Sequence, residues 1–149
     1  MTGKFKRMPG ALNAIAASLL AAAGASALAE VWVPTSQSDD YNAYADPSSI
    51  RRQGDFVKMS SLFDYKTPRP GAAGKTYLST KRQFEYDCKR RQARALGASS
   101  YAEHEGKGGV LASASAPYDW KPVVPDSADE FLLNYACTTT GTGSTGTAK

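Results

Sequence analysis

The stretch that organises the chain runs from Lys75 to Cys88 and reads KTYLSTKRQFEYDC. Apolar side chains fall at even positions: Leu78, Phe84, Tyr86 and Cys88. Mostly polar side chains alternate with them: Tyr77, Ser79, Lys81, Gln83, Glu85 and Asp87. A period of two predicts a strand with one face on a core and the other in water. Arg82 interrupts the apolar series, so this face is expected to approach an edge there.

The segments on either side of this stretch predict an antiparallel sheet. Residues 55–65 also alternate, and the Pro/Gly-rich loop 68–74 turns the chain back, which is typical of a hairpin. Residues 89–101 stay open between helix and strand, because their helix propensity is good but no apolar stripe is present. Further strands are expected at 31–33 (ended by Pro34), 41–45 (ended by the turn signal 46–49) and 110–116 (packed on a bulky partner).

A helix is predicted near the C-terminus. Ser127 and Glu130 form a capping box, in which each side chain accepts a backbone N–H of the other residue. The expected apolar stripe consists of Ala128, Phe131, Leu132 and Tyr135. Residues 138–149 form a Thr/Gly/Ser tail with little to bury, which predicts disorder.

Residues 1–29 have the features of a signal peptide. A basic start at Lys4, Lys6 and Arg7 precedes a short apolar run and an Ala-Leu-Ala ending, which predicts cleavage between Ala29 and Glu30. A membrane anchor is the alternative, but the apolar run is short for a span. A lipid anchor would need a cysteine directly after the cleavage site, where Glu30 stands, so we expect no lipid anchor and a soluble mature protein in the periplasm or outside the cell.

Removing this segment changes the charge balance. The full chain has a formal net charge of +4, from 18 basic and 14 acidic residues. The segment holds three of the basic residues and none of the acidic ones, which leaves the mature 120 residues at +1. This balance argues against a nucleic-acid partner, and the length suits one domain, predicted over residues 30–137.

The two cysteines, Cys88 and Cys137, are expected to form a disulfide, because export leads to an oxidising compartment. The bond would tie the predicted helix to the central strand. Its loop of about 50 residues would contribute roughly 4 kcal/mol in the chain-entropy model. A metal site is disfavoured, because His104 is the only histidine available to join them.

Patterns typical of enzymes are weak in this sequence. Gly74-Lys75-Thr76 resembles the end of a phosphate-binding loop, but Arg69 stands where that motif needs glycine. His104 is the only candidate histidine base, and no G-x-S-x-G motif is present. We therefore predict a protein that is not an enzyme and uses no cofactor.

Basic residues concentrate on both sides of Cys88. Lys81, Arg82, Arg90 and Arg91 could form a patch for acidic polymers. The alternative, which we favour, is a solvated strand face partly neutralised by Glu85 and Asp87. The first predicts binding that falls steeply with salt, and the second predicts weak binding.

Several short motifs together resemble the surface-adhesin protein E family. They are Tyr44-Ala45-Asp46, Ser49-Ile50-Arg51, Val57-Lys58-Met59, Phe63-Asp64-Tyr65, Tyr77-Leu78-Ser79, Glu85-Tyr86-Asp87-Cys88, Trp120-Lys121-Pro122-Val123, Pro125-Asp126-Ser127 and Cys137. The resemblance implies an α+β fold, with an antiparallel sheet of about six strands and a C-terminal helix packed on it. It also favours a strand at 89–101.

The same resemblance implies a non-enzymatic role at the bacterial envelope. It implies binding to a protein partner, such as a host extracellular-matrix protein, and formation of a homodimer. This sequence departs from the family's adhesin in lacking a lipidation cysteine. The alternatives are a periplasmic structural or stress-related envelope protein and, less favoured, a small exported enzyme.

Overall fold

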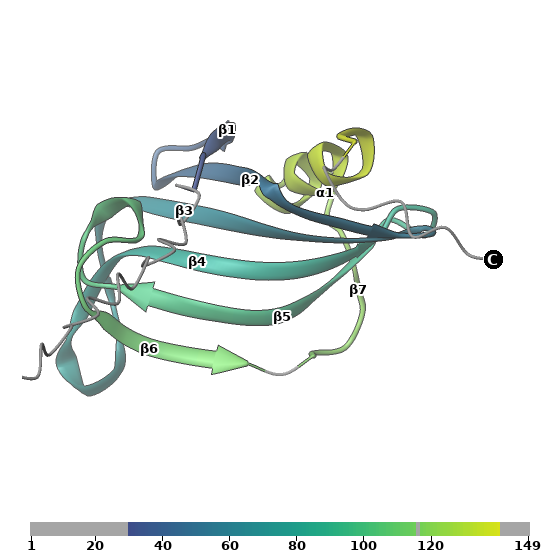
Figure 1. Ribbon diagram of the computed structural model, residues 1–149. Helices are drawn as coiled ribbons and strands as arrows, with labels where there is room; N and C mark the ends of the chain where they lie inside the picture. Colours follow the sequence, from purple (N-terminus) through teal and green to yellow (C-terminus); the bar gives the residue numbers. More distant parts are fainter. Residues whose placement is uncertain (1–29, 116, 141–149) are drawn as a thin grey trace, which may run out of the picture.

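The computed structural model describes residues 30–115 and 117–140, so the predicted signal peptide with Ala29 and residues 141–149 of the predicted tail lie outside it. The described residues form an antiparallel sheet with one C-terminal α-helix, which confirms the predicted α+β fold (Figure 1). The strands are β1 (Val33–Gln37), β2 (Tyr41–Gln53), β3 (Phe56–Pro70), β4 (Thr76–Asp87), β5 (Gln92–Tyr101), β6 (Val110–Ser115) and β7 (Lys121–Pro122). The helix is α1 (Ala128–Thr138), and short 3-10 turns lie at Ala72–Gly74 and His104–Gly106.

The strands pair in chain order, from β1 at one edge to β6 at the other. Each neighbouring pair is antiparallel, as expected for successive hairpins. The two-residue strand β7 also pairs with β5, where Gln92 lies opposite Pro122. The edge of β5 that faces away from β4 therefore pairs with β6 over the C-terminal half of β5 and with β7 near the start of β5. The segment predicted as either helix or strand is the strand β5, preceded by a turn at residues 88–91.

Strands β2 and β3 are longer than the sequence pattern predicted, and β3 ends at Pro70, inside the expected loop 68–74. We expected the turn signal at 46–49 to end the second strand, but β2 continues to Gln53 through an irregularity between Asp46 and Arg51. The Asp46 carboxylate accepts the Ser48 N–H at 2.9 Å, and the Ser49 hydroxyl accepts the Ser60 N–H of β3 at 2.8 Å. These side chains form hydrogen bonds with backbone N–H groups of β2 and β3, so residues that usually form turns produce a bulge here.

The first strand was also misplaced. We expected residues 31–33, stopped by Pro34, whereas β1 spans Val33–Gln37 and contains the proline. Pro34 is tolerated because β1 is an edge strand, and the register shifts between Pro34 and Ser36.

Helix α1 covers one face of the sheet over β1 to β4, as Figure 1 shows above the upper strands. The core lies between them and includes Ala43, Ala45, Ile50, Val57, Met59, Tyr86, Leu132, Leu133 and Ala136. In the described chain no helix is both long and apolar enough to cross a bilayer.

The buried side of α1 differs from the predicted stripe. Phe131 is 48% exposed, whereas Leu133 and Ala136 are buried beside the expected Ala128 and Leu132. Because Phe131, Leu132 and Leu133 are consecutive and all apolar, the helix has two overlapping apolar faces, and the periodicity does not decide which of them is buried. The N-cap prediction is confirmed for Ser127, which accepts the Glu130 N–H at 3.3 Å. Glu130, however, accepts the N–H of Asp126 at 2.8 Å, one residue before the expected partner.

Two predicted solvent exposures are wrong. The outward side of β4 was expected in water, yet Glu85 and Asp87 are only 8% and 4% exposed. Arg94 pairs with Glu85 at 2.5 Å, and Asp87 accepts the N–H groups of Lys89 and Arg90 in the following turn. Conversely, β6 was expected against a bulky partner, but it is an edge strand and almost all of its residues are exposed.

Candidate functional site

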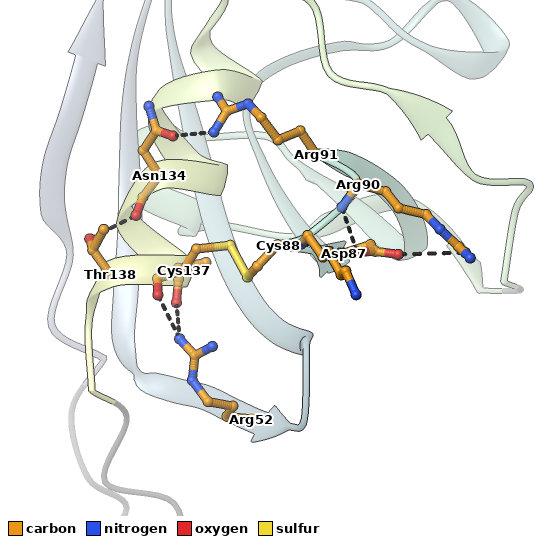
Figure 2. The surroundings of a disulfide bond; sticks show 10 residues. Arg52, Asp87, Cys88, Arg90, Arg91, Asn134, Cys137 and Thr138 are labelled. Carbon is orange, nitrogen blue, oxygen red and sulfur yellow. Dashed lines mark hydrogen bonds and ion pairs between the residues drawn. A yellow bond between two sulfur atoms is a disulfide. The ribbon is translucent and has the colours of Figure 1, made fainter.

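The disulfide between Cys88 and Cys137 is present, with 5.7 Å between the Cα atoms (Figure 2). Cys88 follows directly after β4, and Cys137 lies in the last turn of α1. The bond therefore joins the end of the helix to the β4–β5 turn, as predicted. It fixes helix α1 to the sheet.

Arginine side chains hold the same helix from two sides (Figure 2). Arg52 of β2 donates to the backbone carbonyls of Ala136 and Cys137, at 3.1 and 2.8 Å. These are helix C-terminal carbonyls without intrahelical partners, where a cation is favourable. Arg91 bonds the Asn134 amide oxygen at 3.1 Å and the Glu130 carboxylate at 2.7 Å. The N–H of Asp126, and then the Arg91 guanidinium, hold the pKa of Glu130 below its usual value.

The structure does not bring together the four residues of the predicted basic patch. Lys81 and Arg82 are consecutive in β4, so their side chains point to opposite faces of the sheet. Arg90 and Arg91 lie at the β4–β5 turn, and of these Arg91 is engaged with α1. Arg90 and Arg91 are both exposed, with side chains 75% and 50% accessible, and Arg90 also pairs with Asp87 at 3.9 Å.

Arg82 lies in an aromatic cluster on the helix side of the sheet. Its guanidinium is 4.0 Å from the centre of the Phe63 ring and 3.3 Å from the Tyr65 hydroxyl. Tyr41 packs on Phe63, and Tyr77 packs on Tyr65. This stacking explains why an arginine can interrupt the apolar series of β4.

Lys81 lies on the opposite face, between two aromatic rings. Its ammonium is 5.6 Å from the ring centre of Trp32 and 5.4 Å from that of Tyr101. It also pairs with the Glu30 carboxylate. The segment 30–32 thus lies over this face, and Leu62 beneath it is 1% exposed. The role of Trp32 could not be read from the sequence, because its cation partner Lys81 is 49 residues away.

His104, the only histidine, bonds Asp64 through Nδ1 at 2.9 Å. A carboxylate that orients a histidine is one part of a hydrolase triad, but a nucleophile must also contact the other ring nitrogen. Within residues 30–115 and 117–140 we find no such bond, and no cluster of three His, Cys, Asp or Glu side chains suited to a metal ion. Asp64 also accepts the Glu105 N–H at 3.1 Å, so the pair holds the β5–β6 turn against β3.

The outer edge of β6 is the least protected edge of the sheet. The residues of β6 and of the part of β5 next to it carry no charge: Val110 to Ser115 in β6 and Leu96 to Tyr101 in β5. The opposite edge strand β1 is short, contains Pro34 and is irregular. Among the residues that the structure describes, no strand lies beyond β6 in the sheet (Figure 1). Sequence pattern could not identify this edge, because the order of the strands decides which one is outermost.

The comparisons with known proteins agree with this architecture. The model of the family described as surface-adhesin protein E matches residues 32–138. Two crystal structures of Haemophilus influenzae protein E share the fold, one from crystal form II and one of the selenomethionine form. The first is 16% identical, with a TM-score of 0.53 over 74% of this chain and 96% of the other. The second is 16% identical, with a TM-score of 0.52 over 76% and 97%.

No curated protein sequence matches the chain significantly. At the identities found, the solved structures establish the fold, while the family model covers well over half of the sequence. The protein therefore belongs to the surface-adhesin protein E family.

Proposed function

We propose that the protein is an exported, non-catalytic module that binds a partner protein at the free edge of β6. Membership of the adhesin family supports a binding role. Export is inferred from the predicted cleavage between Ala29 and Glu30. Because no lipidation cysteine stands directly after that site, we expect the mature protein in the periplasm or outside the cell. The partner is an extracellular-matrix protein of a host, or else another protein of the envelope.

The observation that carries the proposal is the unprotected edge. Strands at the edge of a sheet offer unpaired N–H and C=O groups, and proteins usually block them with lysine, proline or bulges. Over Val110–Ser115 the edge has no proline and no charged side chain. An extended segment of a partner can pair there by strand addition, in which the backbone supplies the affinity.

The small side chains of β6 define the kind of segment that fits. Ala112 and Ala114 point to one face, and Ser113 and Ser115 to the other. A charged partner side chain would lose hydration beside them and gain no ion pair. We therefore expect an uncharged, extended segment.

The test introduces lysines into the edge. A double variant, Ala112→Lys with Ala114→Lys, would be compared with Gln37→Lys and Gln53→Lys, which adds the same charge at two exposed positions away from β6. Binding to immobilised matrix proteins and to purified envelope proteins is measured by interferometry on cleaved protein. We expect the β6 variant to lose binding at least tenfold and the control to retain it.

Each outcome has a clear meaning. Binding only to matrix proteins supports adhesion, and binding only to envelope proteins supports the periplasmic role. Binding that survives in the β6 variant, with an unchanged thermal melt, would place the site elsewhere. No binding to either panel would overturn the proposal. Intact mass of the exported protein tests export separately, because processing should leave Glu30 first.

A further inference from the structure

A hollow lies on the face of the sheet that α1 leaves uncovered. It has a volume of about 290 Å³, close to the lower end of the roughly 300–1,000 Å³ of small-molecule sites. Side chains of four strands and the segment before β1 line it, chiefly Trp32, Ser60, Gln83, Ser99, Ser113 and Ser115. The register explains this grouping, because Ser60 lies opposite Gln83 and Ser99 lies opposite Ser113.

The floor of this groove is rich in hydrogen-bonding groups. The hydroxyls of Ser99 and Ser113 bond to each other at 2.8 Å. The side chains of Ser60, Gln83 and Ser115 make no hydrogen bond within the described chain. Hydroxyl and amide groups both donate and accept, so this floor suits a ligand that also does both.

The groove carries almost no net charge. Lys81 lines it, but its ammonium is paired with Glu30 and covered by Trp32 and Tyr101. Arg82 also lines it, but its guanidinium packs on Phe63 at the opposite face. An acidic polymer would therefore find no free cation here, and a neutral ligand is favoured.

Trp32 supplies an aromatic wall beside the polar floor. It is half-buried and belongs to the segment that crosses this face. Indole rings combine a broad apolar surface with one N–H donor, which suits ligands that are apolar on one side and polar at the rim. A pyranose ring has this character, with C–H groups on its faces and hydroxyls around its edge.

We propose that this groove binds a neutral oligosaccharide, with one ring against Trp32 and its hydroxyls on Gln83 and the serines. The sugar could come from N-acetylated amino-sugar chains of a bacterial envelope or from neutral hexose chains of a host glycan. The shared chemistry is an uncharged pyranose. The groove shares the side chains of Ser113 and Ser115 with β6, but it lies on the face of the sheet and does not use the backbone edge of β6, so it goes beyond the proposed protein binding.

The two tryptophans of the chain make the test direct, because Trp120 lies instead beside Phe56 and Arg94. A Trp120→Phe variant keeps Trp32 as its only tryptophan, and Trp32→Phe keeps only Trp120. Each is titrated with N-acetylglucosamine tetramer and, separately, with glucose tetramer at millimolar concentration. We expect a saturable change of emission in the first variant and none in the second.

Alanine variants then locate the sugar on the floor. Ser99→Ala and Gln83→Ala should each weaken binding about fivefold, the loss of one neutral hydrogen bond. Ser100→Ala is the matched control, since Ser100 is the next residue of β5 and points to the other face. A response to one tetramer identifies the source of the sugar and supports the site. No response to either, or equal weakening by Ser99→Ala and Ser100→Ala, would overturn the proposal.

Discussion

At the scale of single residues, the basic side chains mainly form hydrogen bonds and ion pairs within the fold. Arg52 binds carbonyls at the end of α1, Arg91 binds Glu130, and Arg94 binds the buried Glu85. Sequence pattern placed these residues on strand faces and turns but could not supply their partners. Arg52 and Cys137, for example, are 85 residues apart in the chain. The patch hypothesis was built on nearness in sequence, which the sheet does not preserve.

The disulfide gives a first prediction at this scale. Replacing both Cys88 and Cys137 by alanine should lower the free energy of unfolding by up to roughly 4 kcal/mol, because the bond closes a loop of about 50 residues in the unfolded chain. Urea unfolding of the two proteins measures the difference. Thiol titration of unfolded, unreduced wild type should find no free thiol, and two free thiols in material from the periplasm would contradict the pairing.

Tyr86 gives a pH-dependent prediction. Burial, and then the nearby Asp129 carboxylate, raise the pKa of Tyr86 well above its ordinary value. The folded state therefore keeps the proton while the unfolded chain releases it near pH 10. This contribution to stability is complete below that pH and is lost as the pH rises further. Unfolding at pH 8 and pH 11 should show a smaller alkaline loss for Tyr86→Phe than for wild type, and equal losses would refute the assignment.

At the scale of elements, local patterns predicted which segments are strands and helix better than where they end. The alternation in β3 and β4 and the cap of α1 depend on neighbouring residues, so they could be read directly. The ends depended on distant contacts. Asp46 and Ser49 bond the backbone of β2 and β3 and so turn an expected stop into a bulge. Pro34 remains inside β1 because that strand lies at an edge.

The helix cap can be tested by substitution. Ser127→Ala removes the side-chain acceptor for the Glu130 N–H and should cost about 1 kcal/mol of stability. Ser127→Asp keeps an acceptor at the same position and should retain most of it. Urea midpoints of the two variants measure this difference. If both variants lose the same stability, Ser127 does not stabilise the protein through its N-cap hydrogen bond.

At the scale of the whole molecule, the arrangement explains which parts of the candidate sites could not be predicted. The order of strands puts β6 outermost, and the register brings Ser60, Gln83 and Ser99 onto one face beside Trp32. None of these residues forms a motif along the chain. The predicted disulfide, by contrast, needed only two cysteines and an exported chain.

The charge balance gives a last prediction. After the predicted cleavage the chain would have a net charge of +1, and Lys81, Arg82 and Arg91 are occupied by partners within the fold. Heparin should therefore bind only weakly at physiological salt. A column titration with salt compares wild type with a variant in which Lys81, Arg82, Arg90 and Arg91 are serine. If the column retains the wild type strongly but not the variant, and the variant keeps its thermal melt, the basic-patch hypothesis would be supported after all.

The disulfide between β4 and α1 also sets an order of events during biosynthesis. A chain made from its N-terminus presents the whole meander before the helix that covers its apolar face. At about 5–20 residues per second, the stretch from Cys88 to Cys137 takes roughly 2–10 s to make. During that interval Cys88 has no partner within the chain, and the face over Val57 and Met59 has no cover. Helix α1 is thus made after the sheet that it covers, and chains that stop short of it carry a free Cys88 thiol and an uncovered sheet face.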